Sequence, residues 1–208
     1  MSRHRSSDPV FTLLLVCTGN ICRSALAERL GRAYLDKALG DERAAEIQLV
    51  SAGVAAVVGS GMHPDSALVL RGLGGTPDGF RARQLSDHIA VNADLTLTMT
   101  RAHRRNVLKL APRALSRTFT LREAAGLLPL IETDGLLHGE TAAARARALV
   151  RRLSAARSLR QSTDEDDDIP DPIGRPLEVH QEVGEAVAAV LIPVLDRLVP
   201  ERRCPPQR

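Results

Sequence analysis

Two cysteines and an arginine stand close together near the start of the chain. Cys17, Cys22 and Arg23 belong to the stretch Cys-Thr-Gly-Asn-Ile-Cys-Arg-Ser, residues 17–24, which follows the apolar run 11–16. The pattern predicts a strand, a tight loop and a helix N-terminus, whose backbone N–H groups converge on one point and bind an oxyanion. Such a loop favours the thiolate of a cysteine at its mouth, and arginine adds a planar, two-pronged donor. The stretch therefore predicts a cysteine nucleophile directed at a bound phosphoryl group.

A candidate general acid lies far downstream. The stretch Ile-Pro-Asp-Pro-Ile-Gly, residues 169–174, precedes a helix-like run from Glu178 to Leu198. An aspartic acid can protonate a leaving oxygen and then, as a carboxylate, activate the water that hydrolyses a cysteinyl-phosphate. An Asp-Pro pair alone is most often a turn, but Pro172 also restricts the backbone beside Asp171. Taken by itself, the pair leaves Asp171 a candidate acid.

Strand-like and helix-like segments alternate along the chain. Strands are predicted over 11–16, 47–51, 95–99 and 118–121, and helices over 25–39, 64–73, 101–110, 141–159 and 178–198. This alternation predicts one α/β domain, a four-stranded parallel sheet flanked by helices on both faces, with the phosphate-binding loop after the first strand. Ligands of such sheets bind beyond the carboxyl ends of the strands, where Cys17 is expected. The domain is expected over residues 11–199, between a flexible N-terminus at 1–10 and a flexible tail at 200–208.

The composition argues against several classes of protein. The 208 residues are 44% hydrophobic and carry a formal net charge of +3. No apolar run reaches the roughly 18 residues that cross a bilayer, and no signal-peptide cleavage pattern follows the first apolar stretch; we expect a cytoplasmic protein without membrane insertion. With no Trp and one Tyr, nucleic-acid binding is not expected. Three cysteines make no disulfide framework, and no Cys/His spacing indicates a metal site.

An acidic run, Asp-Glu-Asp-Asp-Asp, occupies residues 164–168, just before the candidate acid. Such a run is usually a solvated loop. The alternative is that it raises the local negative potential near Asp171 and disfavours loss of the proton from that side chain.

Residues 17–24 resemble the phosphate-binding loop of the low-molecular-weight protein tyrosine phosphatases, and residues 169–174 match the acid loop of that family. The segments 51–53, 63–64 and 93–100 match the family in order and type, and 118–123 resembles a subset of bacterial members. The resemblance runs from about Thr12 to Leu198. It implies a cysteine-dependent phosphatase that needs no cofactor and acts on a phosphorylated protein, with phosphotyrosine as the expected substrate and a tyrosine kinase as a candidate partner.

The resemblance also assigns roles to the residues of the loop. Cys17 is the nucleophile, Arg23 clamps the phosphate and Asp171 is the general acid. The bound phosphate is expected to contact the loop residues Thr18, Gly19, Asn20, Ile21, Cys22 and Arg23.

Three supporting roles follow from the same resemblance. Asn20 holds the loop in a strained shape, with Ser51 as its hydrogen-bond partner. Ser24 donates to the sulfur of Cys17 and eases its departure, and the same position also suits an N-cap. Cys22 forms a reversible disulfide with the nucleophile; the alternative is a small buried hydrophobic residue.

The sequence departs from the family where aromatic side chains usually flank the substrate ring. Ile173 follows Pro172, and residues 54–59 read Val-Ala-Ala-Val-Val-Gly. Aromatic walls stack well on a phosphotyrosine ring, so this pocket is expected to bind the ring more weakly, with an aliphatic slot as the alternative to aromatic walls. Family members that act on phosphoarginine commonly have Thr at the position of Ile21, which favours an aryl phosphate here.

Three alternative functions remain on the same scaffold. One is a protein arginine phosphatase and another is an arsenate reductase, because arsenate is also a tetrahedral oxyanion. Thioredoxin-coupled reductases need a resolving cysteine pair in a mid-chain loop, and no cysteine lies between Cys22 and Cys204. The third is a non-catalytic phospho-binding module, against which the intact set of Cys17, Arg23 and Asp171 argues.

Overall fold

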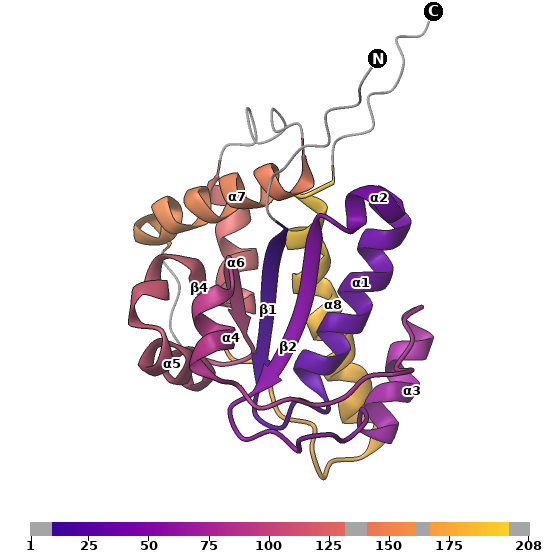
Figure 1. The fold of residues 1–208 in the computed structure, drawn as a ribbon. Helices are drawn as coiled ribbons and strands as arrows, with labels where there is room; N and C mark the ends of the chain where they lie inside the picture. The colour runs from indigo at the N-terminus through magenta and orange to yellow at the C-terminus, as the bar shows by residue number, and fades with distance from the viewer. Residues whose placement is uncertain (1–9, 132–140, 161–166, 200–208) are drawn as a thin grey trace, which may run out of the picture.

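The computed structural model describes residues 10–131, 141–160 and 167–199, and a parallel sheet forms the centre of this part of the chain (Figure 1). Its strand order is β2-β1-β3-β4 and every neighbouring pair is parallel. The strands are β1 (Phe11–Cys17), β2 (Ile47–Gly53), β3 (Leu95–Thr98) and β4 (Thr118–Thr120). The predicted four-stranded parallel sheet flanked by helices is confirmed.

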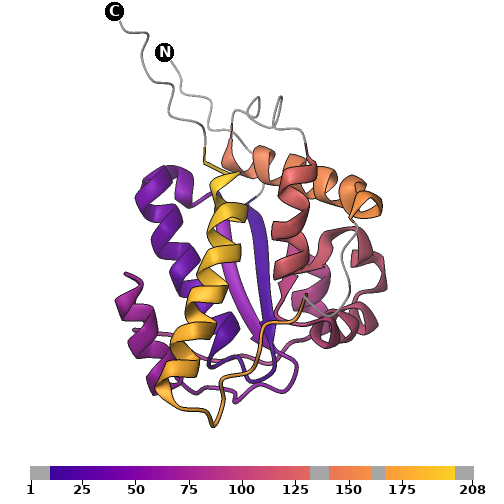
Figure 2. The ribbon, with the colours of Figure 1, turned by 180° about the vertical axis from the view of Figure 1, so that it is seen from behind.

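Helices cover both faces of the sheet. They are α1 (Arg23–Leu39), α2 (Asp41–Ala44), α3 (Pro64–Gly72), α4 (Asp87–Asn92), α5 (Arg101–Leu110), α6 (Leu121–Leu127), α7 (Ala142–Ala156) and α8 (Leu177–Asp196). Figure 2 shows α8 across one face, between α1 and α6, and Figure 1 shows α4 and α5 on the other side. Helix α7 lies across the end of the sheet where the strands begin (Figure 1).

The central strand β1 is buried on both faces. Leu13 and Leu15 pack into the core beneath α1, α6 and α8, whereas Leu14 and Val16 pack into a second cluster beneath α4 and α5. Successive side chains of a strand point to opposite faces, so a strand with helices on both sides needs a continuous apolar run. This is why residues 11–16 read as uninterrupted hydrophobic sequence.

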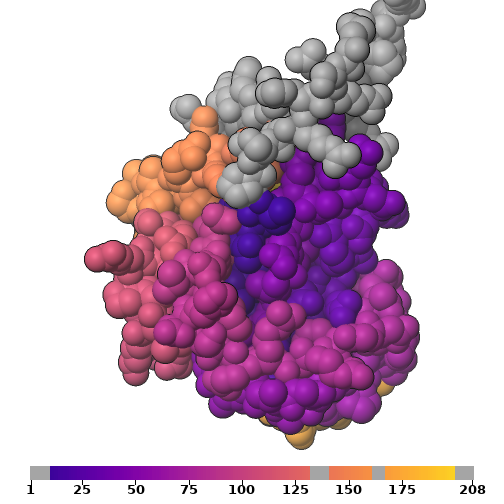
Figure 3. All heavy atoms as spheres, in the orientation of Figure 1, coloured from indigo at the N-terminus to yellow at the C-terminus, as the bar shows by residue number. Residues whose placement is uncertain are grey.

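The strand register brings the carboxyl ends of the strands to one edge. Cys17 pairs with Gly53, and Thr98 pairs with both Val16 and Thr120. In Figure 3 the segments that follow β2, coloured purple to magenta, cover the lower end of the molecule, where the strands end. The candidate nucleophile therefore lies at the edge where α/β sheets bind ligands.

The structure contains short helices that periodicity did not predict. Helix α6 follows directly on β4 through a capping box, in which Thr120 and Glu123 bond to each other's backbone N–H. Ser86 is the N-cap of helix α4, and its side chain accepts from the N–H of Ile89. Two turns of helix carry too few apolar positions to show a 3.6-residue period. The Thr-x-x-Glu pattern was the available signal for α6.

Several predictions lie outside the part of the chain that the structure describes. They are the flexible ends expected at 1–10 and 200–208, of which only residue 10 is described, and residues 164–166 of the acidic run. Among the described helices, none combines the length and apolar character that a membrane crossing requires.

Gly184 allows α8 to pack closely against α3. A Cβ atom at Gly184 would stand 2.4 Å from Cγ1 of Val69. We expect Gly184→Ala to lower the free energy of unfolding by about 1–3 kcal/mol, because the two helices must move apart. A urea titration measures this change. The control is Gly72→Ala at the end of α3, where an added Cβ meets nothing within 4 Å and stability should not fall. Equal stability of Gly184→Ala and the wild type would contradict this account of the helix packing.

Candidate active site

The loop between β1 and α1 is hydrogen-bonded along its length to the segment that follows β2. Four carbonyl oxygens of residues 17–21 accept hydrogen bonds of 2.8–3.0 Å from backbone N–H groups of residues 54–63. Gly53 lies so close that a Cβ atom there would stand 2.3 Å from the carbonyl oxygen of Thr18. With its carbonyls engaged outward, the loop can turn N–H groups toward its centre, which is the geometry of an anion cradle.

Asn20 adopts a left-handed backbone conformation with φ of 54°. Its Oδ1 accepts from the backbone N–H of Arg83 at 2.8 Å, which fixes the orientation of the amide. Its Nδ2 donates to the hydroxyls of Ser24 at 2.9 Å and Ser51 at 2.8 Å. Ser51 in turn donates to a carboxylate oxygen of Glu28 at 2.6 Å. Sequence reasoning did not identify Glu28, which nothing in its local sequence distinguishes from a surface residue of α1.

The sulfur of Cys17 takes part in two hydrogen bonds. The backbone N–H of Asn20 donates to it at 3.3 Å, and the hydroxyl of Ser24 lies 2.9 Å from it. A thiolate has no hydrogen to donate, so the Ser24 hydroxyl is the donor whenever Cys17 is ionised. Both contacts, together with the N-terminus of α1, stabilise a negatively charged sulfur.

Arg23 and Asp171 meet across the mouth of the loop. The Arg23 side chain is 3% exposed, and its Nη2 forms an ion pair with Asp171 Oδ2. Its Nη1 donates to the carbonyl of Ile169 at 2.9 Å, while the N–H of Ile169 donates to the Met99 carbonyl at 2.8 Å. The acid loop is thereby held between the end of β3 and the guanidinium. Among the described residues, the buried Nε of Arg23 has no hydrogen-bond partner.

A cavity of about 220 Å³ opens over the loop. It is lined by the loop residues Cys17, Thr18, Gly19, Ile21, Cys22 and Arg23 and by Asp171. The remaining walls are the side chains of Ala55, Val57 and Ile173. An aliphatic slot is thus present in the structure.

The structure brings the predicted site residues together. Cys17, Thr18, Gly19, Ile21, Cys22, Arg23 and Asp171 line one cavity, and Asn20, Ser24 and Ser51 form the hydrogen-bond network beneath it.

His103 is a further residue of the site that sequence reasoning missed. It lies in the first turn of α5 and its ring bridges two hydroxyls, that of Thr18 at 3.0 Å and that of Thr100 at 2.9 Å. Thr18 also accepts from Nη2 of Arg23 at 3.3 Å. Burial, and secondarily the charge of Arg23, lowers the pKa of His103 to about 4. The sequence offered one signal for His103: it lies five residues after Thr98, the last residue of β3, and ligands of parallel sheets bind at the carboxyl ends of the strands.

The solvated-loop expectation was wrong for Asp167, whereas Asp168 is exposed as expected. Asp167 is buried and accepts from Nη1 of Arg160 at 2.8 Å. Asp168 accepts from the backbone N–H of Arg101 at 2.8 Å, which caps the N-terminus of α5. These carboxylates anchor the chain on its way to the acid loop.

Cys22 and Cys17 are both buried free thiols. Burial raises the pKa of Cys22 to about 11, and a hydrogen bond from Ser66 opposes this effect. Cys22 is therefore a neutral thiol near pH 7 and a poor nucleophile.

His103 makes the stability of the fold depend on pH. Its pKa is about 4 in the folded chain against 6.5 for the free side chain, so between these values the unfolded state binds the proton. The free energy of unfolding should fall by about 1.4 kcal/mol per pH unit on acidification across this window. His103→Gln should remove this component from the slope, which urea titrations at several pH values measure. His88→Gln, an exposed histidine on α4, is the matched control; an unchanged slope in His103→Gln would contradict the assignment.

Comparison with known proteins places this geometry in a family. A family model described as low molecular weight phosphotyrosine protein phosphatase matches residues 12–126. The low molecular weight protein-tyrosine-phosphatase Wzb of Escherichia coli K12 is 38% identical over 100 residues, which are 48% of this chain and 62% of Wzb. The chain thus spans less than two thirds of the length of this curated relative.

Solved structures extend the likeness to the region beyond residue 126. The YwlE arginine phosphatase of Geobacillus stearothermophilus superposes with a TM-score of 0.62 and 26% identity, over 90% of this chain and 92% of that chain. A low molecular weight protein tyrosine phosphatase of T. tengcongensis gives the same TM-score and identity, over 90% and 99%. The chain belongs to the low molecular weight phosphotyrosine protein phosphatase family.

Proposed function

We propose that this protein is a cysteine-dependent phosphatase that hydrolyses phosphomonoesters through a cysteinyl-phosphate. The observation that carries the proposal is the convergence of three side chains on one cavity: the sulfur of Cys17, the guanidinium of Arg23 and the carboxyl group of Asp171. A nucleophile, an oxyanion clamp and an acid are the groups that phosphoryl transfer to a protein side chain requires.

The reaction follows from these positions. The Cys17 thiolate attacks phosphorus while the loop N–H groups and Arg23 hold the equatorial oxygens. The Nε of Arg23, which has no partner among the described residues, and the adjacent Nη2 donate together to two phosphoryl oxygens. Binding of the phosphoryl group therefore replaces the ion pair between Arg23 and Asp171. Released from the guanidinium and placed beside the negatively charged phosphoryl group, the Asp171 carboxylate takes up a proton from solvent. The resulting carboxylic acid then protonates the leaving oxygen, which departs as an alcohol or phenol.

The second step regenerates the enzyme. Asp171, now a carboxylate, accepts a proton from water as the water oxygen attacks phosphorus. The S–P bond breaks and inorganic phosphate leaves. The Ser24 hydroxyl lies 2.9 Å from the sulfur and stabilises the departing thiolate.

Phosphotyrosine in a protein is the proposed substrate class. An aryl ring in the cavity would lie against Ala55, Val57 and Ile173, whose apolar atoms suit a ring that is less polar than a guanidinium. The names of Wzb and of the T. tengcongensis structure support this choice. A tyrosine kinase that acts on the same protein, and a cytoplasmic location whose reducing conditions keep Cys17 a thiol, belong to the proposal.

Phosphoarginine is the second candidate substrate, because the YwlE arginine phosphatase is among the similar structures. Turnover of a phosphotyrosine peptide, a phosphoarginine peptide and arsenate on the purified protein separates the candidates. We expect the phosphotyrosine peptide to be hydrolysed fastest; a faster phosphoarginine reaction would reverse the substrate assignment while leaving the mechanism intact.

Cys17→Ser should lose phosphatase activity by several orders of magnitude, because serine forms no stable anion near neutral pH. The rate of phosphate release from para-nitrophenyl phosphate measures this loss. Cys204→Ser, which removes a cysteine far from the motif, is the matched control and should keep its activity. Activity of Cys17→Ser within about tenfold of the wild type would exclude Cys17 as the nucleophile.

Asp171→Asn should slow hydrolysis of a phosphotyrosine peptide by about 10²–10⁴-fold, the usual contribution of a general acid. Para-nitrophenyl phosphate should lose less, because its leaving group needs little protonation. Asp78→Asn, an exposed carboxylate outside the site, is the control. Equal losses for the two substrates would show that Asp171 acts through structure and not as the acid.

A further inference from the structure

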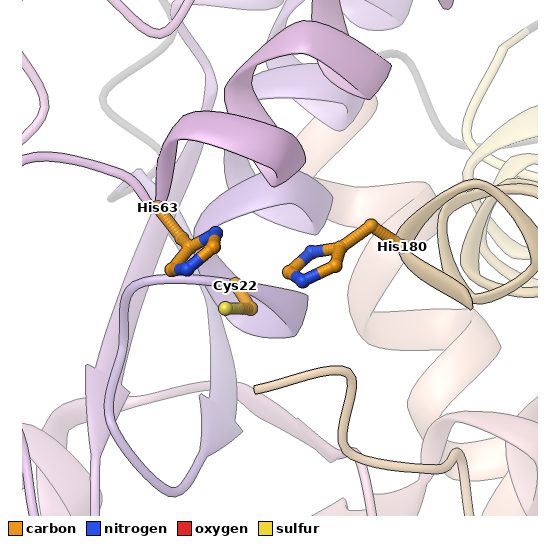
Figure 4. A group of neighbouring side chains, drawn as sticks. All are labelled: Cys22, His63 and His180. Carbon is orange, nitrogen blue, oxygen red and sulfur yellow. The ribbon is translucent and has the colours of Figure 1, made fainter. Parts of the chain in front are cut away.

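A cluster of three metal-binding side chains lies beside the loop, on elements that are far apart in sequence. Cys22 precedes α1, His63 precedes α3, and His180 lies in the first turn of α8. Figure 4 shows the three side chains converging from these elements. One ligand atom from each lies within 4.8 Å of the other two. We call this group the Cys22–His63–His180 cluster.

His180 presents an unused nitrogen to this cluster. Its side chain is fully buried and its Nδ1 is 2.9 Å from the Ser66 hydroxyl. Within the part of the chain that the structure describes, its Nε2 has no hydrogen bond of normal geometry, although the Pro172 backbone also acts on the ring. Nδ1 of His63 is likewise buried and without a partner among the described residues, and the two rings stack with centroids 4.7 Å apart. Buried polar atoms are nearly always hydrogen-bonded. Two orphan nitrogens next to a thiol therefore point to a ligand that accepts electron pairs from all three.

A carboxylate stands at the entrance to the cluster. Oδ2 of Asp65 lies 3.9 Å from Nδ1 of His63 and 4.0 Å from Nε2 of His180, so it faces the same two orphan nitrogens. The Asp65 side chain is 40% exposed and that of His63 is 25% exposed. A cation can thus reach the buried atoms from solvent, and the negative charge at the entrance favours its approach.

We propose that the Cys22–His63–His180 cluster is a binding site for Zn²⁺. One thiolate and two imidazole nitrogens are a borderline-soft donor set that suits zinc, whereas Mg²⁺ and Ca²⁺ require oxygen ligands. Zinc bond lengths of about 2.0–2.3 Å place tetrahedral ligands roughly 3.3–3.7 Å apart, so the three atoms must approach one another by about 1 Å. Side-chain rotation of partly exposed His63 supplies such a movement.

The surroundings supply the rest of a metal centre. The Cys22 thiol gives its proton to solvent when the metal–sulfur bond forms. The Ser66 hydroxyl at Nδ1 fixes the ring of His180 so that Nε2 faces the metal, as second-shell partners do. Asp65 or a water molecule takes the fourth position. Bound zinc would tie the last residues of the phosphate-binding loop to α3 and α8, and this binding does not depend on the proposed catalysis.

The test uses full-length protein in which Cys22 is the only cysteine. The variant Cys17→Ser/Cys204→Ser removes the other two of the three cysteines in the chain. Titration with Co²⁺, followed by ultraviolet and visible absorption, should saturate at one ion per chain with a thiolate-to-cobalt charge-transfer band. Zn²⁺ should abolish the band and Mg²⁺ should not. Because no other thiol is present, failure to observe the band would overturn the proposal.

The histidines are tested in the same background. His63→Ala and His180→Ala should each weaken Co²⁺ binding by at least about tenfold, since even outer-shell changes cost 10–100-fold in affinity. His88→Ala is the matched control and should bind like the parent. Melting curves without metal establish that each variant is folded, with His180→Gln replacing His180→Ala if that variant is not. Affinities equal to that of the parent in both folded histidine variants would overturn the assignment of these ligands.

Discussion

Asn20 adopts a left-handed backbone conformation, and the candidate site depends on the side-chain hydrogen bonds that stabilise this conformation. That conformation costs an ordinary L-residue roughly 1–2 kcal/mol. The amide of Asn20 makes three hydrogen bonds, to the Arg83 backbone and to the hydroxyls of Ser24 and Ser51. At about 0.5–1.5 kcal/mol each, these bonds outweigh the strain. The same amide donates to the Ser24 hydroxyl, which lies 2.9 Å from the sulfur of Cys17. One side chain therefore shapes the loop and positions a hydroxyl beside Cys17.

The loop that carries Asp171 is held beside the Cys17 cavity by hydrogen bonds at Ile169. Its N–H bonds to the carbonyl of Met99 at the end of β3, and its carbonyl receives Nη1 of Arg23. Asp168, one residue earlier, caps α5. The positions of Arg23 and Asp171 are consequently coupled, because the guanidinium that lines the cavity also holds the loop that carries Asp171.

Cys22 and His103 are buried groups beside the cavity whose charged forms are disfavoured. Burial keeps the Cys22 thiol protonated and the His103 imidazole neutral at pH 7, by raising the pKa of the first and lowering that of the second. The Cys17 sulfur is also buried, and it contacts the backbone N–H of Asn20 and the hydroxyl of Ser24.

The sequence by itself determined the sheet, the order of the main helices and the loop of residues 17–24, because these depend on local periodicity and on a contiguous motif. Asp171 was identified only through the resemblance, since no local force relates it to Cys17. Tertiary structure alone decided the contacts of Glu28 and His103, the burial of Asp167 and the meeting of Cys22, His63 and His180. Each of these joins residues from different elements, and their proximity is set by helix packing on the sheet, which no local pattern records.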